Sequence, residues 1–325
     1  MRSRSGRHTL ISHASRVAAC IIAVCTGVSA CSRQSADPAP NLAGTAPPIT
    51  PAPAQPITQL TPDLYVVSTR AANMAVLAGK DSSLIVGPQL PSLDSAARTL
   101  LAEHHAGAVR MVVVAPEDSA AVYADGGWGR DDALVLTHEN LRARMSQLRH
   151  SGATLPPAAA HSALPTLGFS EVVQMYVDGN SVHAIHHRAG YSDADLIVHF
   201  EDANVVYLGN TLTTDGYPAI DLGRGGSLAG MIETIESFKP FPATTRFIPG
   251  RGPVASKQTL DAYGAMLVDV LGRVKHDMDA GQSEAQVVAS KPTAGYDARW
   301  GHGAVSADTF VQMVYESLTA DGASR

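Results

Sequence analysis

Residues 168–212 read GFSEVVQMYVDGNSVHAIHHRAGYSDADLIVHFEDANVVYLGNTL and indicate the fold more clearly than any other part of the sequence. Short runs within this stretch are rich in Val, Ile, Tyr and Phe, which is the composition of β-strands. Asp178-Gly179-Asn180 stands between two of these runs and is typical of a hairpin turn. We therefore expect consecutive strands over residues 174–177, 182–186, 195–200 and 204–208.

The residues before this stretch predict strands and one helix. Strand-like runs cover residues 64–68, 74–78 and 84–86, and apolar residues at helical spacing follow over 93–101. Ser92 or Asp94 is the expected cap of that helix. The run Met111–Ala115 is continuously apolar, which indicates a strand buried on both faces. This order of elements predicts a layered α/β domain.

The residues after residue 212 predict mainly helices. Ser227 can open one helix, and apolar residues spaced along 260–274 predict a long amphipathic helix that ends at Gly281. A final helix begins after Ser306, and residues 246–248 form one more short strand. Two halves with similar β-then-α content fit a sandwich of two sheets with helices outside.

The first 30 residues resemble a secretory signal peptide. They contain four arginines and no acid, then a short apolar run, VAACIIAVCTGVSA, over residues 17–30. That run is about half as long as a membrane-spanning helix, so a retained anchor helix is not expected. We predict that residues 1–30 are a signal peptide and that the protein is exported.

Residues 28–31, Val-Ser-Ala-Cys, resemble a bacterial lipobox, in which cleavage leaves a lipidated cysteine. Cys31 is then the lipidation site, and acyl chains would anchor the protein on the periplasmic side of the cell envelope. A plain signal peptide cut near Ala30 is the alternative. Residues 31–56 are rich in Pro and Ala and predict an extended tether, which leaves residues 57–325 as the folded domain.

The charge of the chain argues against nucleic acid as a partner. The formal net charge is −6, and the body beyond the arginine-rich first residues is more acidic still. A phosphate backbone requires a basic surface. No protein partner can be named from the sequence.

Beyond these patterns, several motifs resemble the metallo-β-lactamase superfamily of hydrolases. They are the stretch 168–212, the segment YPAIDLGRGGSLAGMIETI at 217–235, FIPGRGPVASKQTLDAYGAML at 247–267 and KPTAGYDARWGHGAVSADTFVQMVYESL at 291–318. The resemblance implies an αββα sandwich with a metal site at one edge of its two sheets. In this family, clustered histidines and carboxylates hold zinc, which makes hydroxide available at neutral pH.

The positions that the resemblance assigns to metal ligands carry other residues here. The histidine-rich loop of the family is PEDSAAVYADGGW, residues 116–128, and contains no histidine. A later histidine becomes a tyrosine, the bridging aspartate becomes an asparagine, and the Pro-Gly-His-Gly turn becomes Pro-Gly-Arg-Gly. We therefore predict no metal and no cofactor. The substituted positions that would line the cleft are Ser119, Tyr123, Tyr191, Asn210 and Arg251.

The remaining polar residues have ordinary interpretations. His138, His186 and His187 are expected in structural or surface roles, and Asp193 and Asp195 as solvated loop acids. Gly225-Gly226-Ser227 is expected to form a turn and a helix cap.

The sequence thus favours a non-catalytic, exported lipoprotein of this fold. Its cleft is either a relic or a pocket for a small anion, because Arg251 places a cation where a metal ligand would stand. Three alternatives stay open. One is a hydrolase that works without the usual metals, and another is an interaction protein that uses the surface of the fold and not the cleft. The third is that Arg251 only pairs with a nearby acid such as Asp193 or Asp215.

Overall fold

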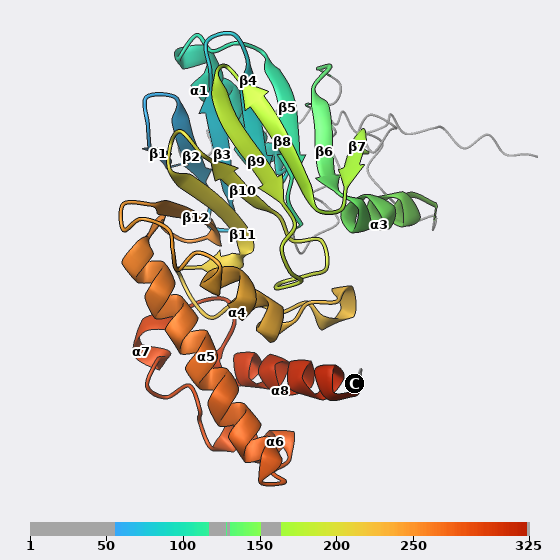
Figure 1. Ribbon diagram of the computed structural model, residues 1–325, viewed down its shortest axis with the longest axis vertical. Helices are drawn as coiled ribbons and strands as arrows, with labels where there is room; N and C mark the ends of the chain where they lie inside the picture. Colours follow the sequence, from blue (N-terminus) through green and yellow to red (C-terminus); the bar gives the residue numbers. More distant parts are fainter. Residues whose placement is uncertain (1–55, 117–127, 129–130, 151–163, 324–325) are drawn as a thin grey trace, which may run out of the picture. The chain divides into compact units, whose positions relative to one another are not determined.

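The computed structural model describes residues 56–116, 128, 131–150 and 164–323 (Figure 1). Contacts group residues 1–52 apart from residues 53–325, and the description below concerns the second unit. Cys31 and the predicted signal peptide lie outside the described residues, as do Ser119 and Tyr123. Within the described ranges, no helix is both long enough and apolar enough to cross a membrane.

Thirteen strands in the described part form two sheets, and both sheets mix antiparallel and parallel pairs. The first sheet runs in chain order: β1 (Ile57–Gln59), β2 (Leu64–Ser68), β3 (Asn73–Ala78), β4 (Ser83–Gly87), β5 (Val109–Val114), β6 (Leu134–His138) and β7 (Leu167–Phe169).

The second sheet runs in the reverse order: β13 (Ala255–Ser256), β12 (Arg246–Arg251), β11 (Val205–Thr213), β10 (Ile197–Phe200), β9 (Asn180–Ile185) and β8 (Val172–Val177).

Alternating side chains on the strands build separate layers of apolar core. In β2, Leu64 and Val66 face the core between the two sheets, whereas Tyr65 and Val67 face a core on the other side of the first sheet. This alternation is the ordinary consequence of the pleat of a strand. Because every position of β2 before Ser68 is apolar and buried, both faces of the first sheet are covered.

Helices cover the outer face of each sheet. On the first sheet they are α1 (Pro91–Glu103) and α3 (Glu139–His150), and on the second sheet α4 (Leu228–Glu236), α5 (Lys257–Asp279) and α8 (Ala307–Ala323). Short helices complete the chain: η3 (Leu222–Arg224), α6 (Glu284–Ala289) and α7 (Asp297–Trp300). The layer order is helix, sheet, sheet, helix, which confirms the predicted αββα sandwich (Figure 1).

One carboxylate joins the turns of two hairpins, one from each sheet. Asp178, in the turn between β8 and β9, accepts hydrogen bonds from the backbone N–H of Lys80 at 2.7 Å and of Asp81 at 2.9 Å. These two residues belong to the turn between β3 and β4. The donated hydrogen bonds lower the pKa of the Asp178 carboxyl. Asp178 therefore connects the two sheets at this end.

The structure corrects one predicted cap. Helix α1 begins at Pro91 after Leu90, and no side chain caps it. Ser92 and Asp94 lie inside the helix, and the Asp94 carboxylate instead accepts a hydrogen bond from the Trp128 indole at 3.0 Å. Proline suits the first helical position because its missing N–H has no partner there. The predicted cap of α4 is correct, since the Ser227 hydroxyl accepts a hydrogen bond from the Gly230 N–H.

Candidate functional site

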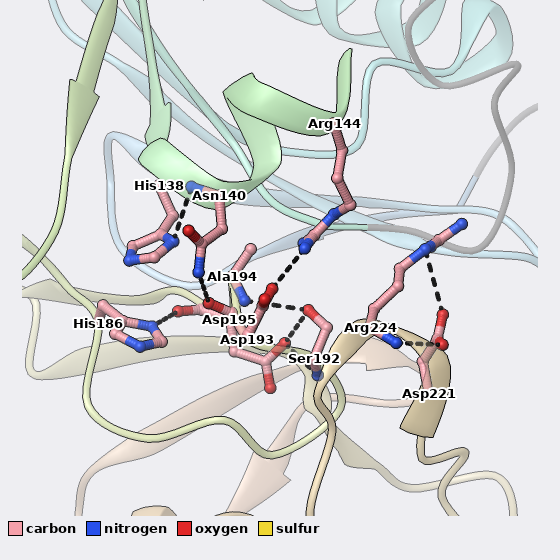
Figure 2. Close-up of polar contacts among 10 residues, drawn as sticks. All are labelled: His138, Asn140, Arg144, His186, Ser192, Asp193, Ala194, Asp195, Asp221 and Arg224. Carbon is pink, nitrogen blue, oxygen red and sulfur yellow. Dashed lines mark hydrogen bonds and ion pairs between the residues drawn. The ribbon is translucent and has the colours of Figure 1, made fainter. Parts of the chain in front are cut away.

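A buried carboxylate organises the loop between β9 and β10 (Figure 2). Asp195 accepts hydrogen bonds from three successive backbone N–H groups, those of Gly190 at 3.1 Å, Tyr191 at 2.6 Å and Ser192 at 2.9 Å. The hydroxyls of Ser192 and Thr211 donate two more, at 2.9 and 3.2 Å. The five donors fix the path of the chain through Tyr191.

This arrangement overturns the interpretation of Asp195 as a solvated loop acid, because Asp195 is only 6% exposed. Burial raises its pKa to about 7, although the hydrogen bonds that it accepts act in the opposite direction. The sequence shows an acid in a polar loop but not the backbone N–H groups that surround it. The spacing to Ser192 was the one available signal, since an acid three residues after a serine can bond back to it.

A second loop, at the end of β12, holds Arg251. The Gly250 backbone passes so close to Asn210 that a Cβ would stand 2.4 Å from the Asn210 Oδ1, and Gly252 has a φ of +91°. Both positions therefore require glycine. The buried Asn73 amide donates to the carbonyls of Pro249 at 2.9 Å and Gly252 at 2.8 Å. Asn73, which the sequence did not single out, thus holds the turn.

The two loops meet at a small pocket. Its lining includes Tyr191, Asn210 and Arg251, three of the five residues predicted for the cleft. The cavity has a volume of about 20 Å³, which is room for about one water molecule. Thr213, Pro218 and Ala219 complete the lining. Ser119 and Tyr123 lie outside the described residues, so their predicted place in the cleft stays a prediction.

Arg251 forms an ion pair beside this pocket. Its Nε donates to the Asp215 Oδ1 at 3.1 Å, and the Thr213 hydroxyl donates to the same oxygen at 2.7 Å. The predicted pairing with a local acid is therefore present for Asp215. Asp193 instead pairs with Arg144 at 2.5 Å, as Figure 2 shows. The bond to Asp215 involves Nε, so the two terminal nitrogens of the guanidinium lie outside it.

Tyr191 carries an uncompensated polar group. The side chain is 1% exposed, and among the described residues its hydroxyl has no hydrogen-bond partner. A buried hydroxyl without a partner is costly, typically by about 1–3 kcal/mol. Such a group in a pocket lining indicates a place where a ligand atom or a water molecule accepts or donates a hydrogen bond.

Two histidines lie beside the Asp195 loop. The rings of His138, at the end of β6, and His186, just after β9, are 4.2 Å apart at their centroids. His186 Nδ1 hydrogen-bonds the Asp195 carbonyl at 2.8 Å, and His138 Nδ1 accepts the Asn140 N–H at 3.3 Å (Figure 2). Burial, and then the neighbouring His186, lower the pKa of His138. These contacts support the structural role expected for both residues.

The residues around the pocket do not fit zinc. Tyr191, Asn210 and Arg251 offer a phenol, an amide and a guanidinium, whereas zinc sites in proteins use imidazole, thiolate and carboxylate. In the described ranges, no group of three or more His, Cys, Asp and Glu residues is placed to hold a metal ion. That finding does not extend to residues 117–127.

A larger groove, of about 1160 Å³, runs along α5 and shares no lining residue with this pocket. Its charged residues mostly pair with one another, as in Lys257 with Asp261 and Arg273 with Asp269. We base the candidate site on the smaller pocket, because its lining includes Tyr191, whose buried hydroxyl has no partner among the described residues, and Arg251 from the turn at the end of β12.

The layers and their connections are those of the metallo-β-lactamase fold. Solved structures with this fold include the inverting sec-alkylsulfatase Pisa1 from Pseudomonas sp. (TM-score 0.54, 16% identity) and a double mutant of that sulfatase (TM-score 0.57, 16% identity). Each alignment covers 81% of this chain, and the chain spans only 50% of the sulfatase. The structure of VMB-1 is also similar, with a TM-score of 0.50 and 12% identity over 66% of this chain and 96% of VMB-1. No protein-family model and no curated protein matches the sequence.

Proposed function

We propose that this chain is an exported, lipid-anchored protein of the metallo-β-lactamase fold whose cleft binds a small anion in place of zinc and does not hydrolyse it. The observation that carries the proposal is the Tyr191 hydroxyl, which among the described residues is buried without a partner, in a pocket that also contains Arg251. A phenol and a guanidinium are both hydrogen-bond donors, and anions are acceptors.

The pocket sets limits on the ligand. Its volume accommodates about one oxygen atom, so the ligand would insert a single oxygen of a carboxylate, phosphate or sulfate group. Because Asp215 offsets the charge of Arg251, the attraction would come from donated hydrogen bonds more than from net charge. The similar sulfatase structures make sulfate a reasonable member of the probe set.

The test is a thermal-shift screen with acetate, phosphate and sulfate. At ten times the Kd, a ligand stabilises a folded protein by about 1.4 kcal/mol. We expect at least one anion to raise the Tm of the wild type, and the shift to be lost in Arg251→Gln and reduced in Tyr191→Phe. Arg188→Gln is the matched control, because Arg188 pairs with Glu233 outside the pocket. Equal shifts in all variants, or no shift in the wild type, would refute anion binding here.

The absence of zinc is tested separately, by elemental analysis of the purified protein and by chelation. We expect no stoichiometric zinc and an unchanged Tm in chelator. A fall of several degrees that zinc reverses would show that the chain holds the metal through residues that we have not assigned.

The alternative, a hydrolase without metals, would use Tyr191 as an acid and Arg251 with Asn210 to stabilise an oxyanion. It is the weaker proposal because, in the described residues, no base hydrogen-bonds the Tyr191 hydroxyl. Hydrolysis of an ester or sulfate ester that disappears in Tyr191→Phe would support it over simple binding.

The lipid anchor is tested by fractionation. Cys31→Ser should move the protein from the membrane fraction to the soluble fraction, because acylation at Cys31 is the proposed attachment. A variant that stays with the membrane would contradict this part of the proposal.

A further inference from the structure

The free edge of the second sheet differs from every other sheet edge in the described part of the chain. Strands β1, β7 and β13, which end the sheets elsewhere, have three, three and two residues. Strand β8 has six, and it pairs with β9 alone. Proteins usually protect sheet edges with short strands, charges, proline or a bulge. Strand β8 reads Val-Val-Gln-Met-Tyr-Val and has none of these.

The face of β8 that points away from the core is open to solvent and carries two large hydrophobic side chains. Val172 is 58% exposed and Tyr176 67%, although both are large hydrophobic residues. Gln174 lies between them on the same face and is also exposed. The alternate residues Met175 and Val177 are buried in the core between the sheets. The helices on the second sheet pack on its other strands, and β8 is the last strand of that sheet, beside β9.

The ladder of β8 determines which backbone groups face outward. The His186 N–H donates to the Glu171 carbonyl, and the register opposes Val177 to Asn180 and Val173 to Ala184. In an antiparallel ladder, alternate residues direct both backbone groups to the neighbour. Residues 171, 173, 175 and 177 therefore bond to β9, and Val172, Gln174 and Tyr176 direct their N–H and C=O groups away from it.

We propose that β8 pairs antiparallel with β8 of a second copy of this chain, with the two Gln174 residues facing each other at the two-fold axis. In this register Val172 of each copy opposes Tyr176 of the other, and all three pairs are of the hydrogen-bonded kind. Aromatic and β-branched residues are favourable cross-strand partners. The arrangement is isologous, which is the commonest symmetry of dimers.

The charges near β8 are compatible with this pairing. The six residues of the strand carry no charge, so like charges do not meet along it. At its ends, Glu171 of each copy comes opposite Val177 of the other, beside the turns that hold Lys80, Asp81 and Asp178. These turns carry acids as well as a cation, so the choice of a second copy rests on the uncharged strand and on its reciprocal Val172–Tyr176 pairs.

Sedimentation equilibrium tests the proposal. It measures the mass of the full chain in density-matched detergent across a range of protein concentrations. We expect a reversible dimer in the wild type. Gln174→Lys places two cations at the two-fold axis and should weaken the dimer about tenfold or more. Val172→Lys should weaken it too, whereas Val268→Lys is the matched control, since Val268 is a 46% exposed apolar residue on α5. A wild type that stays monomeric, or a dimer that Gln174→Lys leaves intact, would overturn the proposal.

Cysteine cross-linking tests the register. Cα atoms of directly opposed residues stand about 5.5 Å apart, which a disulfide can span. Gln174→Cys should therefore give a disulfide-linked dimer under oxidising conditions. Tyr176→Cys alone should not, because its counterpart is Val172, but a mixture of Val172→Cys and Tyr176→Cys chains should. A dimer that links through Tyr176→Cys alone would show a different interface.

Discussion

The hydrogen-bond network around Asp195 and the lining of the pocket beside it differ in how far their buried polar groups are satisfied. In the Asp195 loop, one buried carboxylate accepts five hydrogen bonds. At the pocket wall, the Tyr191 hydroxyl is equally buried and has no partner among the described residues. Fully satisfied buried networks rigidify a structure, and unsatisfied groups indicate an unfinished interaction. The hydrogen bonds of the Asp195 carboxylate are thus complete. Among the described residues, the Tyr191 hydroxyl and the Asn73 Oδ1 are buried without a partner.

Removal of the Asp195 carboxylate should destabilise the protein most. Asp195→Ala leaves three backbone N–H groups buried without an acceptor, so we expect it to lower the free energy of unfolding by about 3–5 kcal/mol. Urea unfolding at neutral pH measures this. If the protein lost less than about 1 kcal/mol, the loop would not depend on Asp195.

The stability should also depend on pH through Asp195. In the folded protein burial raises its pKa to about 7, from an ordinary value of 3.8. Between these pH values the folded state keeps a proton that the unfolded state releases. The contribution to the free energy of unfolding is therefore present at low pH and is lost as the pH rises through the folded pKa. The loss is at most about 4 kcal/mol.

Urea unfolding at pH values from about 4.5 to 8 tests this slope. Asp195→Asn removes the titrating carboxyl. It serves as the control, because every other acid of the protein still titrates in this variant. We expect the difference between wild type and Asp195→Asn to fall with rising pH and to level off above pH 7. A constant difference would mean that Asp195 stays ionised throughout.

At the Arg251 turn, a comparable change is the substitution of Asn73, which holds this turn through its side-chain amide. Asn73→Ala removes two buried hydrogen bonds to the carbonyls of Pro249 and Gly252, and we expect a loss of about 2 kcal/mol in the free energy of unfolding. The variant should also lose the thermal response to anions, since the turn places Arg251. An unchanged response would separate the turn from binding.

The smallest change in stability is expected from removing the Tyr191 hydroxyl. Tyr191→Phe removes only a hydroxyl that has no partner among the described residues, so we expect the free energy of unfolding to stay equal or to rise, by about 1 kcal/mol at most. Chemical denaturation without added anions measures it. A clear destabilisation would reveal a partner for the hydroxyl and remove the main support for a ligand.

The sequence predicted elements in which the apolar residues themselves show the spacing of a strand or of a helix. The strand over 64–68 has the predicted bounds, and the long helix α5 and the cap at Ser227 are present. Strands β1, β7 and β13 were missed because runs of two or three residues carry no periodicity. Strand β6 and helix α3 were also missed, although they have five and twelve residues. Of the residues that the resemblance assigned to the cleft, Tyr191, Asn210 and Arg251 line one small pocket, and their role in ligand binding stays a prediction. Asp195 and Asn73 were missed because their partners are backbone groups, which have no signature in residue types.

The connection that Asp178 makes between two hairpin turns has a consequence for the order of folding. Its partners, Lys80 and Asp81, are almost a hundred residues away in the sequence, so these bonds close a long loop of the chain. Each hairpin can form from local contacts, but the bonds between them can form only after the two sheets have met. In a pulsed hydrogen-exchange experiment, the backbone amides of Lys80 and Asp81 should therefore become protected late. The time at which they become protected therefore reports when one half of the chain docks on the other.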